Sequence, residues 1–425
     1  MNYPDSVHFL YSLGNEIKTA KLGLERIRTV LEALGSPHRT GRFIHVAGTN
    51  GKGSTCAMIE SALRASGRRT GLFTSPHLAE PTERIRLGGE PVTASRFAAA
   101  FDTVHNCVET LLARGVIDLH TTYFETVTAM AFLIFAGERV DEAVIEVGLG
   151  GRLDATNVLV PELCVITPVD FDHEQFLGTS LDAIAAEKAG ILKPGVPAVF
   201  ARQRPEAAEA LDRRAAGLRV PVWRTRDWRI ANLELGASGS RFRLSGGLEL
   251  DLFCPLPGEH QVENAAAAAM ALARLGLPAP AIETGIARAR WPGRLELVGQ
   301  NPDIILDGAH NPAGARALAA YIDRFYAGRR VVLIFGAMRD KSVAEIAGVL
   351  FPRAAAVVAT APRQARALTP ETIAQTAEHP GVRTAPDVAA ALAMARSHAP
   401  DAIVVTGSLF LVAEARALLA AAPLL

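Results

Sequence analysis

The sequence has few cysteines, and their spacing follows no pattern. Its four cysteines, at positions 56, 107, 164 and 254, form no C-x-x-C pair. This excludes a zinc ribbon, a dithiol redox motif and the disulfide framework of a small secreted protein. The chain also lacks a basic N-terminal segment followed by an apolar run, and no stretch reaches the roughly 20 apolar residues of a membrane span. We therefore expect a cytoplasmic protein.

An excess of charge of either sign is also missing. Lys plus Arg and Asp plus Glu both total 44, so no global field draws the protein to nucleic acid or to an anionic membrane. We expect small-molecule substrates, no nucleic-acid or membrane partner, and a monomer. The 425 residues, 49% of them hydrophobic, are too many for one typical domain, so two domains are expected.

Apolar runs of strand length alternate with helical periodicity, which predicts βαβ units and parallel sheets, so the fold class is α/β. In the first part of the chain, strands are expected at Phe43–Ala47, Ala143–Val147, Leu163–Thr167 and Ala198–Phe200, and helices at Ser54–Ala65 and Tyr123–Gly137. Short apolar segments broken by glycines between Trp228 and Phe253 predict a small hairpin-rich sheet. A helix over His260–Leu275 is expected to follow it.

A Pro-Gly breaker at Trp291–Arg294 marks the expected domain boundary. We predict a P-loop NTPase-like domain at residues 1–292, which contains the hairpin-rich sheet, and a Rossmann-like α/β domain at residues 293–425. Strands of the second domain are expected at Ile304–Leu306, Val331–Phe335, Ala356–Ala359 and Ala402–Thr406, and helices at Ala313–Phe325 and Leu409–Leu419.

The sharpest chemical motif is Gly-Thr-Asn-Gly-Lys-Gly-Ser at residues 48–54, between an expected strand and an expected helix. Glycines let backbone N–H groups converge on an anion, the helix N-terminus adds its positive end, and Lys52 would reach the terminal phosphates. Ser54 would offer its hydroxyl to magnesium. Gly53 stands between the Lys and the Ser, unlike the standard G-x-x-x-x-G-K-[ST], and an ordinary glycine turn is the alternative.

Polar residues end or follow two further strands of the first domain. Glu146 ends an apolar strand and is a candidate magnesium ligand, because magnesium in ATP sites takes one or two carboxylates with phosphate oxygens; a charge that merely caps the strand is the alternative. His173, in the segment Asp170–His173, is weaker on chemical grounds because magnesium prefers oxygen.

For two other polar segments, a structural role and a functional role are both possible interpretations. Lys188 lies in the last turn of an expected helix, where it can simply complement the helix dipole. The turn Asp307–Pro312 follows a strand of the second domain and predicts a ligand contact, although Asn311 before Pro312 is also typical of a helix N-cap.

Nine short blocks, in chain order, resemble the folylpolyglutamate synthase and dihydrofolate synthase family, relatives of the Mur ligases. They are residues 48–54, Thr74–Leu78, Glu83–Arg86, Tyr123–Glu125, Gly148–Asn157, Asp172–His173, Glu187–Gly190, Pro292–Arg294 and Asp307–Pro312. The match spans nearly the whole chain. The resemblance implies a P-loop ATPase domain and a Rossmann-like C-terminal domain, with ATP and the acceptor meeting in the cleft between them, and a carbamylated lysine.

The resemblance assigns roles residue by residue. The catalytic residues would be Lys52, His173 and Lys188. The ATP contacts would be Thr49, Asn50, Gly51, Lys52, Gly53, Ser54, Thr55, Asn264, Arg294, Asp307 and His310. The pterin or folate contacts would be Ser75, Pro76, His77, Arg84, Thr122, Tyr123, Phe124, Glu125, Asp154 and Ala155. Two magnesium ions, with potassium as an alternative cation, would be held by Ser54, Ser75, Glu146, His173 and the carbamate of Lys188.

The implied enzyme is an ATP-dependent acid–amino-acid ligase. It would add L-glutamate to 7,8-dihydropteroate, giving dihydrofolate, and to reduced folates, giving folylpolyglutamates, through an acyl phosphate. The alternatives are a monofunctional folylpolyglutamate synthase, a Mur-type ligase of cell-wall synthesis, which normally has a further domain before the phosphate loop, and an ATP-binding regulatory protein. A dinucleotide oxidoreductase is disfavoured because residues 148–151 lack the G-x-G-x-x-G spacing.

Overall fold

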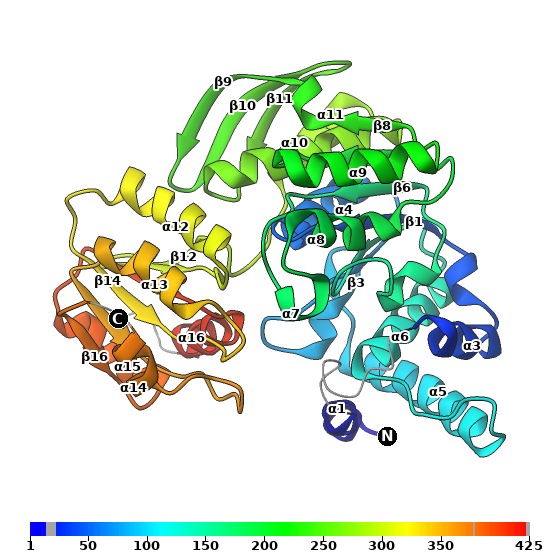
Figure 1. The fold of residues 1–425 in the computed structure, drawn as a ribbon, viewed down its shortest axis with the longest axis horizontal. Coiled ribbons are helices and arrows are strands. Elements are labelled where there is room, and N and C mark those ends of the chain that lie inside the picture. Colours follow the sequence, from blue (N-terminus) through cyan, green and yellow to red (C-terminus); the bar gives the residue numbers. More distant parts are fainter. Residues whose placement is uncertain (14–22, 377–378, 422–425) are drawn as a thin grey trace. The chain divides into compact units, whose positions relative to one another are not determined.

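The computed structural model describes residues 1–13, 23–376 and 379–421 (Figure 1). The chain forms two compact units. The first comprises Met1–Ile230, Arg243–Leu252 and Glu263–Ala289, and the second comprises Ala231–Phe242, Phe253–Val262 and Arg290–Leu425. Two segments before residue 263 thus belong to the second unit, whereas the expected boundary assigns everything up to residue 292 to the first domain; that boundary stays a prediction.

The first unit is built on an eight-stranded sheet in the order β4-β3-β2-β5-β1-β6-β7-β8. Its strands are β1 Arg42–Ala47, β2 Thr70–Phe73, β3 Ile85–Leu87, β4 Glu90–Pro91, β5 Glu142–Glu146, β6 Leu163–Ile166, β7 Ala198–Phe200 and β8 Val222–Arg224. Neighbouring strands are parallel except in the β2–β3 and β3–β4 pairs, which are antiparallel and lie at one edge of the sheet. The predicted parallel sheet is confirmed, but β2, β3, β4 and β8 are not among the expected strands, because segments this short carry little periodicity.

Helices of the first unit pack on this sheet and on one another. They are α1 Tyr3–Ser12, α3 Glu25–Ala33, α4 Lys52–Ala65, α5 Ala94–Ala113, α6 Tyr123–Gly137, α7 Glu174–Leu177, α8 Leu181–Lys188, α9 Pro205–Gly217 and α11 Ala279–Ala287. Phe132 of α6 packs with Phe43 of β1 in one buried cluster, and α8 and α9 lie side by side (Figure 1). The predicted helix from Ser54 starts earlier, at Lys52, so the lysine of the phosphate loop belongs to the helix.

The predicted hairpin-rich sheet is present as three strands in the order β11-β10-β9. These strands are β9 Arg229–Gly236, β10 Gly239–Ser245 and β11 Glu249–Cys254. The alanine-rich helix follows as α10, Glu259–Arg274, within one residue of its expected ends.

The second unit contains a six-stranded sheet in the order β12-β13-β17-β14-β15-β16. Its strands are β12 Glu296–Gly299, β13 Asp303–Leu306, β14 Val331–Phe335, β15 Ala356–Ala359, β16 Val382–Thr384 and β17 Ala402–Thr406; its helices are α12 Pro312–Phe325, α13 Val343–Leu350, α14 Pro370–Thr376, α15 Val388–Ser397 and α16 Leu409–Ala421. Only β12 runs antiparallel. The α/β alternation is confirmed, although β12 and β16 are not among the expected strands.

Strand order decides where the polar loops of the first unit meet. β1 lies between β5 and β6, with Val46 opposite Glu146 and Ala47 opposite Ile166. The carboxyl ends of adjacent parallel strands share one edge of the sheet, which is the usual place for an α/β site. The loops after β1, β5 and β6 are therefore brought together at this edge.

Candidate active site

Two glycines of the phosphate loop have positive φ angles, 146° at Gly48 and 85° at Gly51. A Cβ atom on Gly48 would lie 1.9 Å from Oγ1 of Thr167, and one on Gly51 would lie 2.2 Å from Oδ1 of Asn264. Only glycine fits both the backbone conformation and the space. Asn264, predicted from the resemblance as an ATP contact, therefore packs directly on the phosphate loop.

The phosphate loop is tied to the loop after β6 and carries Lys52 on its own carbonyl groups. Thr49 N–H donates to the carbonyl of Pro168 (3.0 Å), and Thr49 Oγ1 donates to the carbonyl of Asp170 (2.9 Å). Lys52 Nζ donates to the carbonyl oxygens of Gly48 (3.2 Å) and Thr49 (3.1 Å). The ammonium group thus rests on the loop at the N-terminus of α4, where backbone N–H groups favour an anion.

Lys188 reaches the same loop from the end of α8. Its Nζ donates to the carbonyl of Gly48 (2.9 Å), and the residue is only 4% exposed. Burial lowers the pKa of Lys188 to about 7, helped by the positive charge of Lys52 and opposed by Asp172 and Asp154. A large fraction of this amine is therefore neutral at neutral pH, unlike an ordinary lysine.

Two further glycines hold the backbone around Lys188 in place. A Cβ on Gly151 would lie 2.8 Å from the carbonyl oxygen of Glu187, and one on Gly190 would lie 2.4 Å from Cα of Arg152. The N–H of Arg152 donates to the carbonyl of Glu187 (2.9 Å). The loop after β5 and the end of α8 are thus in backbone contact, which fixes the base of the Lys188 side chain.

Oxygen donors suited to magnesium lie at the same edge. Glu146 and Ser54 are 4% and 2% exposed, and Oε2 of Glu146 accepts a hydrogen bond from the N–H of Ser75 (3.1 Å). Ser54 lies in the first turn of α4, directly after the phosphate loop. Magnesium binds through one or two carboxylates plus phosphate oxygens, so the donor set fits this ion.

His173 begins α7 in the left-handed conformation, with φ 51°. Its Nε2 lies 3.8 Å from Oδ1 of Asp172. Among the described residues, neither His173 nor Glu146 belongs to a group of three His, Cys, Asp or Glu side chains spaced to hold an ion. Metal binding at this edge would thus need Ser54, phosphate oxygens or a carbamate on Lys188.

Asp154, a predicted substrate contact, holds the loop after β5. Its carboxylate accepts hydrogen bonds from the N–H groups of Gly148 (3.0 Å), Leu149 (2.9 Å) and Thr156 (3.0 Å), and from the Thr156 hydroxyl. His45 Nε2 lies 2.8 Å from Thr156 Oγ1, and burial lowers the pKa of His45 to about 3. Because the Thr156 hydroxyl donates its hydrogen to Asp154, its oxygen accepts from Nε2–H of the neutral His45 ring, and this contact helps to orient Asp154.

Glu125, a second predicted substrate contact, is occupied by two structural interactions. With Thr122 it forms the capping box of α6, accepting from the Thr122 N–H (2.8 Å). It also forms a buried ion pair with Arg26 of α3, with Arg26 N–H donating over 2.6 Å and side-chain exposures of 12% and 7%. Nothing in the sequence motifs points to Arg26.

A cluster of aromatic and cationic side chains gathers beside the N-terminus of α6. The guanidinium of Arg84 lies 4.9 Å from the ring centre of Tyr123. Tyr11 stacks on Tyr123, with centroids 5.8 Å apart and planes inclined by 5°. Arg84 Nε donates to His77 Nδ1 (2.9 Å), and His77 Nε2 lies 3.3 Å from the Tyr11 hydroxyl. Burial lowers the pKa of His77 to about 3, so its ring is neutral.

The segment between β2 and β3 is closed by Glu83. Its carboxylate accepts from the N–H groups of Leu78 (2.8 Å), Ala79 (3.0 Å) and Glu80 (3.0 Å). Three backbone N–H groups on one carboxylate fix the conformation of this segment. Of the remaining predicted substrate contacts, Phe124 and Ala155 are buried, whereas Pro76 is exposed.

The predicted ATP contacts of the second unit lie around the turn after β13. Asp307 is 6% exposed and accepts from the N–H groups of Leu295 (2.9 Å) and Ala309 (3.0 Å). Burial raises the pKa of Asp307, and nearby Arg294 opposes that shift. His310 Nδ1 donates to the carbonyl of Gly308 (2.8 Å), which restrains the orientation of its ring.

Asn311 caps α12, since its Oδ1 accepts from the N–H of Gly314 (2.8 Å) and Pro312 begins the helix. The capping role that the sequence leaves open is confirmed. In contrast, Tyr11 and His45 are not among the predicted site residues, because neither lies in a motif and each gains its partner only through the fold.

Family models of known proteins match most of the chain. The Mur ligase middle domain matches residues 46–272, and the Mur ligase glutamate ligase domain matches residues 293–409. The dihydrofolate synthase/folylpolyglutamate synthase of Mycobacterium tuberculosis is 36% identical over 93% of this chain and 89% of its own length.

Solved structures give the same answer. The M. tuberculosis folylpolyglutamate synthase complexed with ADP superposes with a TM-score of 0.93, at 35% identity over 99% of both chains. Escherichia coli FolC in complex with DHPP and ADP superposes with a TM-score of 0.89, at 31% identity over 99% of this chain and 98% of that one. The chain belongs to the dihydrofolate synthase/folylpolyglutamate synthase family of the Mur ligase superfamily.

Proposed function

We propose that the protein is an ATP-dependent ligase that adds L-glutamate to 7,8-dihydropteroate and to reduced folates. The observation that carries this proposal is the pair of lysines at the phosphate loop, Lys52 and Lys188, which both donate to the carbonyl of Gly48. The relatives with bound ADP and DHPP support the substrate classes.

Lys188 has the properties that carbamylation requires. Carbon dioxide reacts only with a neutral amine, and burial lowers the pKa of Lys188 to about 7. The neutral amine forms an N–C bond with carbon dioxide and releases one proton, so the side chain becomes an anion next to Lys52. The like-charge repulsion at the loop is thereby removed, and an oxygen ligand for a metal is created.

Two magnesium ions would be held by Ser54, Ser75, Glu146, His173 and the Lys188 carbamate. When bound, magnesium neutralises phosphate charge and orients the terminal phosphate. The N–H of Ser75 donates to one oxygen of Glu146 and so orients this carboxylate at the end of β5.

The phosphate loop and Lys52 would perform the first chemical step. A carboxylate oxygen of the pteroate or folate attacks the terminal phosphorus of ATP, and ADP leaves. Charge grows on the transferred group, and the loop N–H groups, the α4 N-terminus and Lys52 stabilise it. The glutamate amine then attacks the acyl carbon of the acyl phosphate, phosphate leaves, and the nitrogen loses a proton to give the amide.

The cluster of Tyr11, His77, Arg84 and Tyr123 is the proposed pterin-side surface. Flat heteroaromatic rings bind well to aromatic faces and to guanidinium planes. Asp154 and Glu125 would act here by holding the loop after β5 and the start of α6, rather than by facing the ligand, because backbone donors and Arg26 already occupy their carboxylates.

ATP, magnesium and small-molecule substrates are thus the proposed ligands, and a monomer in the cytoplasm is the proposed state. None of the helices in the described parts of the chain has the length and apolar character needed to cross a bilayer.

The decisive experiment measures glutamate-dependent phosphate release from ATP and magnesium, with dihydropteroate and tetrahydrofolate offered separately and the products weighed by mass spectrometry. Turnover with both acceptors supports the bifunctional enzyme, and turnover with tetrahydrofolate alone identifies a monofunctional folylpolyglutamate synthase. Phosphate release in the absence of both acceptors would overturn the proposal, and so would the absence of phosphate release with each of the two acceptors.

A further inference from the structure

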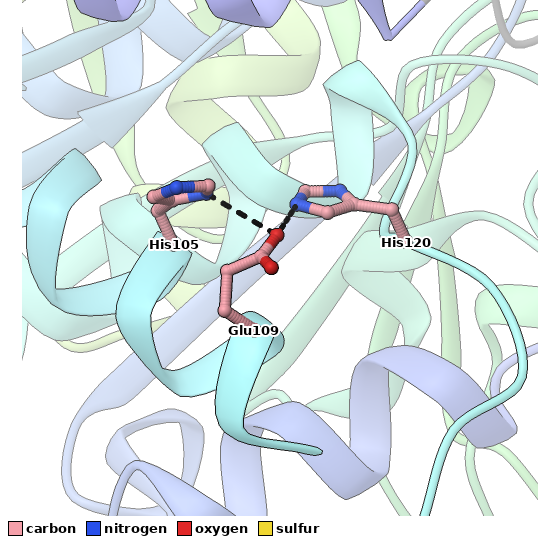
Figure 2. Close-up of side chains that lie close together, drawn as sticks. All are labelled: His105, Glu109 and His120. Atoms are coloured by element: carbon pink, nitrogen blue, oxygen red, sulfur yellow. Dashed lines mark ion pairs between the residues drawn. The ribbon is translucent and has the colours of Figure 1, made fainter. Parts of the chain in front are cut away.

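Three potential metal ligands meet away from the phosphate loop, at the far end of α5. His105 and Glu109 lie one helical turn apart on α5, and His120 lies in the connection between α5 and α6 (Figure 2). The spacing of four residues places the first two side chains on the same face of the helix, and the connection folds back to bring His120 to that face.

The three ligand atoms are close together. Oε1 of Glu109 lies 4.0 Å from Nδ1 of His105 and 3.7 Å from Nε2 of His120, and all three atoms lie within 4.8 Å of one another. With metal bonds of ~2.0–2.2 Å, ligand atoms of a tetrahedral site stand roughly 3.3–3.6 Å apart. Because Glu109 is half exposed, rotation of its side chain would shorten its distances to the two imidazole nitrogens.

Hydrogen bonding fixes the tautomer of His120. Its Nδ1 lies 2.9 Å from the carbonyl oxygen of Thr121. A carbonyl oxygen only accepts, so Nδ1 carries a hydrogen and Nε2 is the nitrogen that faces Glu109. A backbone carbonyl behind one nitrogen, with a metal on the other, is the usual arrangement of ligating histidines.

Aromatic packing fixes the ring of His105. Phe101 stacks on it, with centroids 5.4 Å apart and planes inclined by 9°, and Phe9 meets it edge-on at 4.6 Å. Nδ1 of His105 and Nε2 of His120 are buried and have no hydrogen-bond partner among the described residues. Two oriented imidazole nitrogens therefore face one carboxylate.

We propose that His105 Nδ1, Glu109 Oε1 and His120 Nε2 bind a divalent transition metal of the zinc class. Two imidazoles and one carboxylate suit zinc rather than magnesium, and water would complete the coordination. The metal would clamp α5 to the connection that leads into Thr122 and Tyr123 at the start of α6. This site is independent of the proposed ligase activity.

Zinc titration of the intact protein in excess magnesium tests the site, with binding followed by calorimetry. Glu109→Gln should weaken zinc binding by more than the ~10–100-fold typical of losing an outer-shell partner. The double variant His105→Gln/His120→Gln should bind one equivalent of zinc fewer than the wild type. His8 is an exposed histidine of α1, so the control variant His8→Gln should bind zinc as the wild type does.

Cobalt(II) gives a second readout, because a tetrahedral site produces visible absorption bands that the double variant should lose. Circular dichroism checks that each variant is folded. If the double variant does not fold, Glu109→Gln alone tests the site. Equal zinc stoichiometry and affinity in the wild type and Glu109→Gln would show that the three residues form only an ion-paired cluster and would overturn the proposal.

Discussion

The side-chain nitrogen of Lys188 lies 2.9 Å from the carbonyl oxygen of Gly48, the first residue of the phosphate loop. The two residues are 140 positions apart in the sequence. Lys52 donates to the same carbonyl, so two lysines converge on one oxygen in a buried place. The chemistry of the site depends on which of them stays positive.

Removing the loop lysine should abolish most of the activity. In Lys52→Ala the charge that stabilises phosphoryl transfer is lost, and by analogy with the loss of one oxyanion-hole donor we expect turnover to fall ~10²–10³-fold. The measurement is glutamate-dependent phosphate release at saturating ATP. Arg114→Ala, which removes an exposed cation of the same unit, should have no effect; a Lys52→Ala enzyme with most of its turnover would contradict the assigned role.

Activity should depend on pH and bicarbonate through Lys188. Below its pKa of about 7 the amine is protonated and cannot take up carbon dioxide, so activity should fall as pH drops through this value and recover partly with added bicarbonate. Labelled bicarbonate should give a carbamate carbon signal by NMR that is absent in Lys188→Ala.

A short carboxylic acid added to Lys188→Ala should restore some activity by replacing the carbamate, whereas Lys188→Arg should stay inactive. Full activity of Lys188→Ala in the absence of any added acid would exclude a role for the carbamate.

Breaking the buried pair between Arg26 and Glu125 should destabilise the first unit. Glu125→Ala leaves Arg26 buried without its partner and should lower the free energy of unfolding by ~3–5 kcal/mol. Glu125→Gln keeps the capping box of α6 and should cost less. Urea unfolding measures both values, and a double-mutant cycle with Arg26→Ala should show a coupling energy; additive effects would contradict the pairing.

Replacing Asp154 by asparagine should loosen the loop after β5. The amide nitrogen of asparagine would face backbone N–H donors that the carboxylate now accepts from, so we expect a loss of ~1–3 kcal/mol in unfolding free energy and a raised KM for the pteroate. Thr156→Ser, which keeps the hydroxyl, is the matched control. An unchanged KM in a folded Asp154→Asn enzyme would show that the loop does not shape the acceptor site.

Much of the fold could be predicted because its strands are continuous apolar runs and its helices are periodic. The strand from Arg42 and the helix from Lys52 flank a glycine loop whose chemistry is local, and Asn311 with Pro312 is a local cap. β2 and β16 escape notice because each depends on its neighbours in the sheet more than on its own few residues.

The site residues also differ in whether their roles depend on local sequence or on the fold. Glu125 is predicted as a substrate contact from its motif, but its partner Arg26 lies 99 positions away and appears only in the fold. Tyr11 and His45 likewise gain their roles from Tyr123 and Thr156, with which they share no sequence pattern.

The sequence by itself determined the α/β class, the phosphate loop and the family, because each is written in short stretches of chain whose backbone conformation and hydrogen bonding are local. Tertiary structure alone decided that Lys188 is desolvated beside Lys52, that Asp154 and Glu125 hold loops, and that His105, Glu109 and His120 meet. Burial, charge proximity and ligand geometry depend on distances between residues remote in the chain, and those distances exist only once the strands are ordered in the sheet.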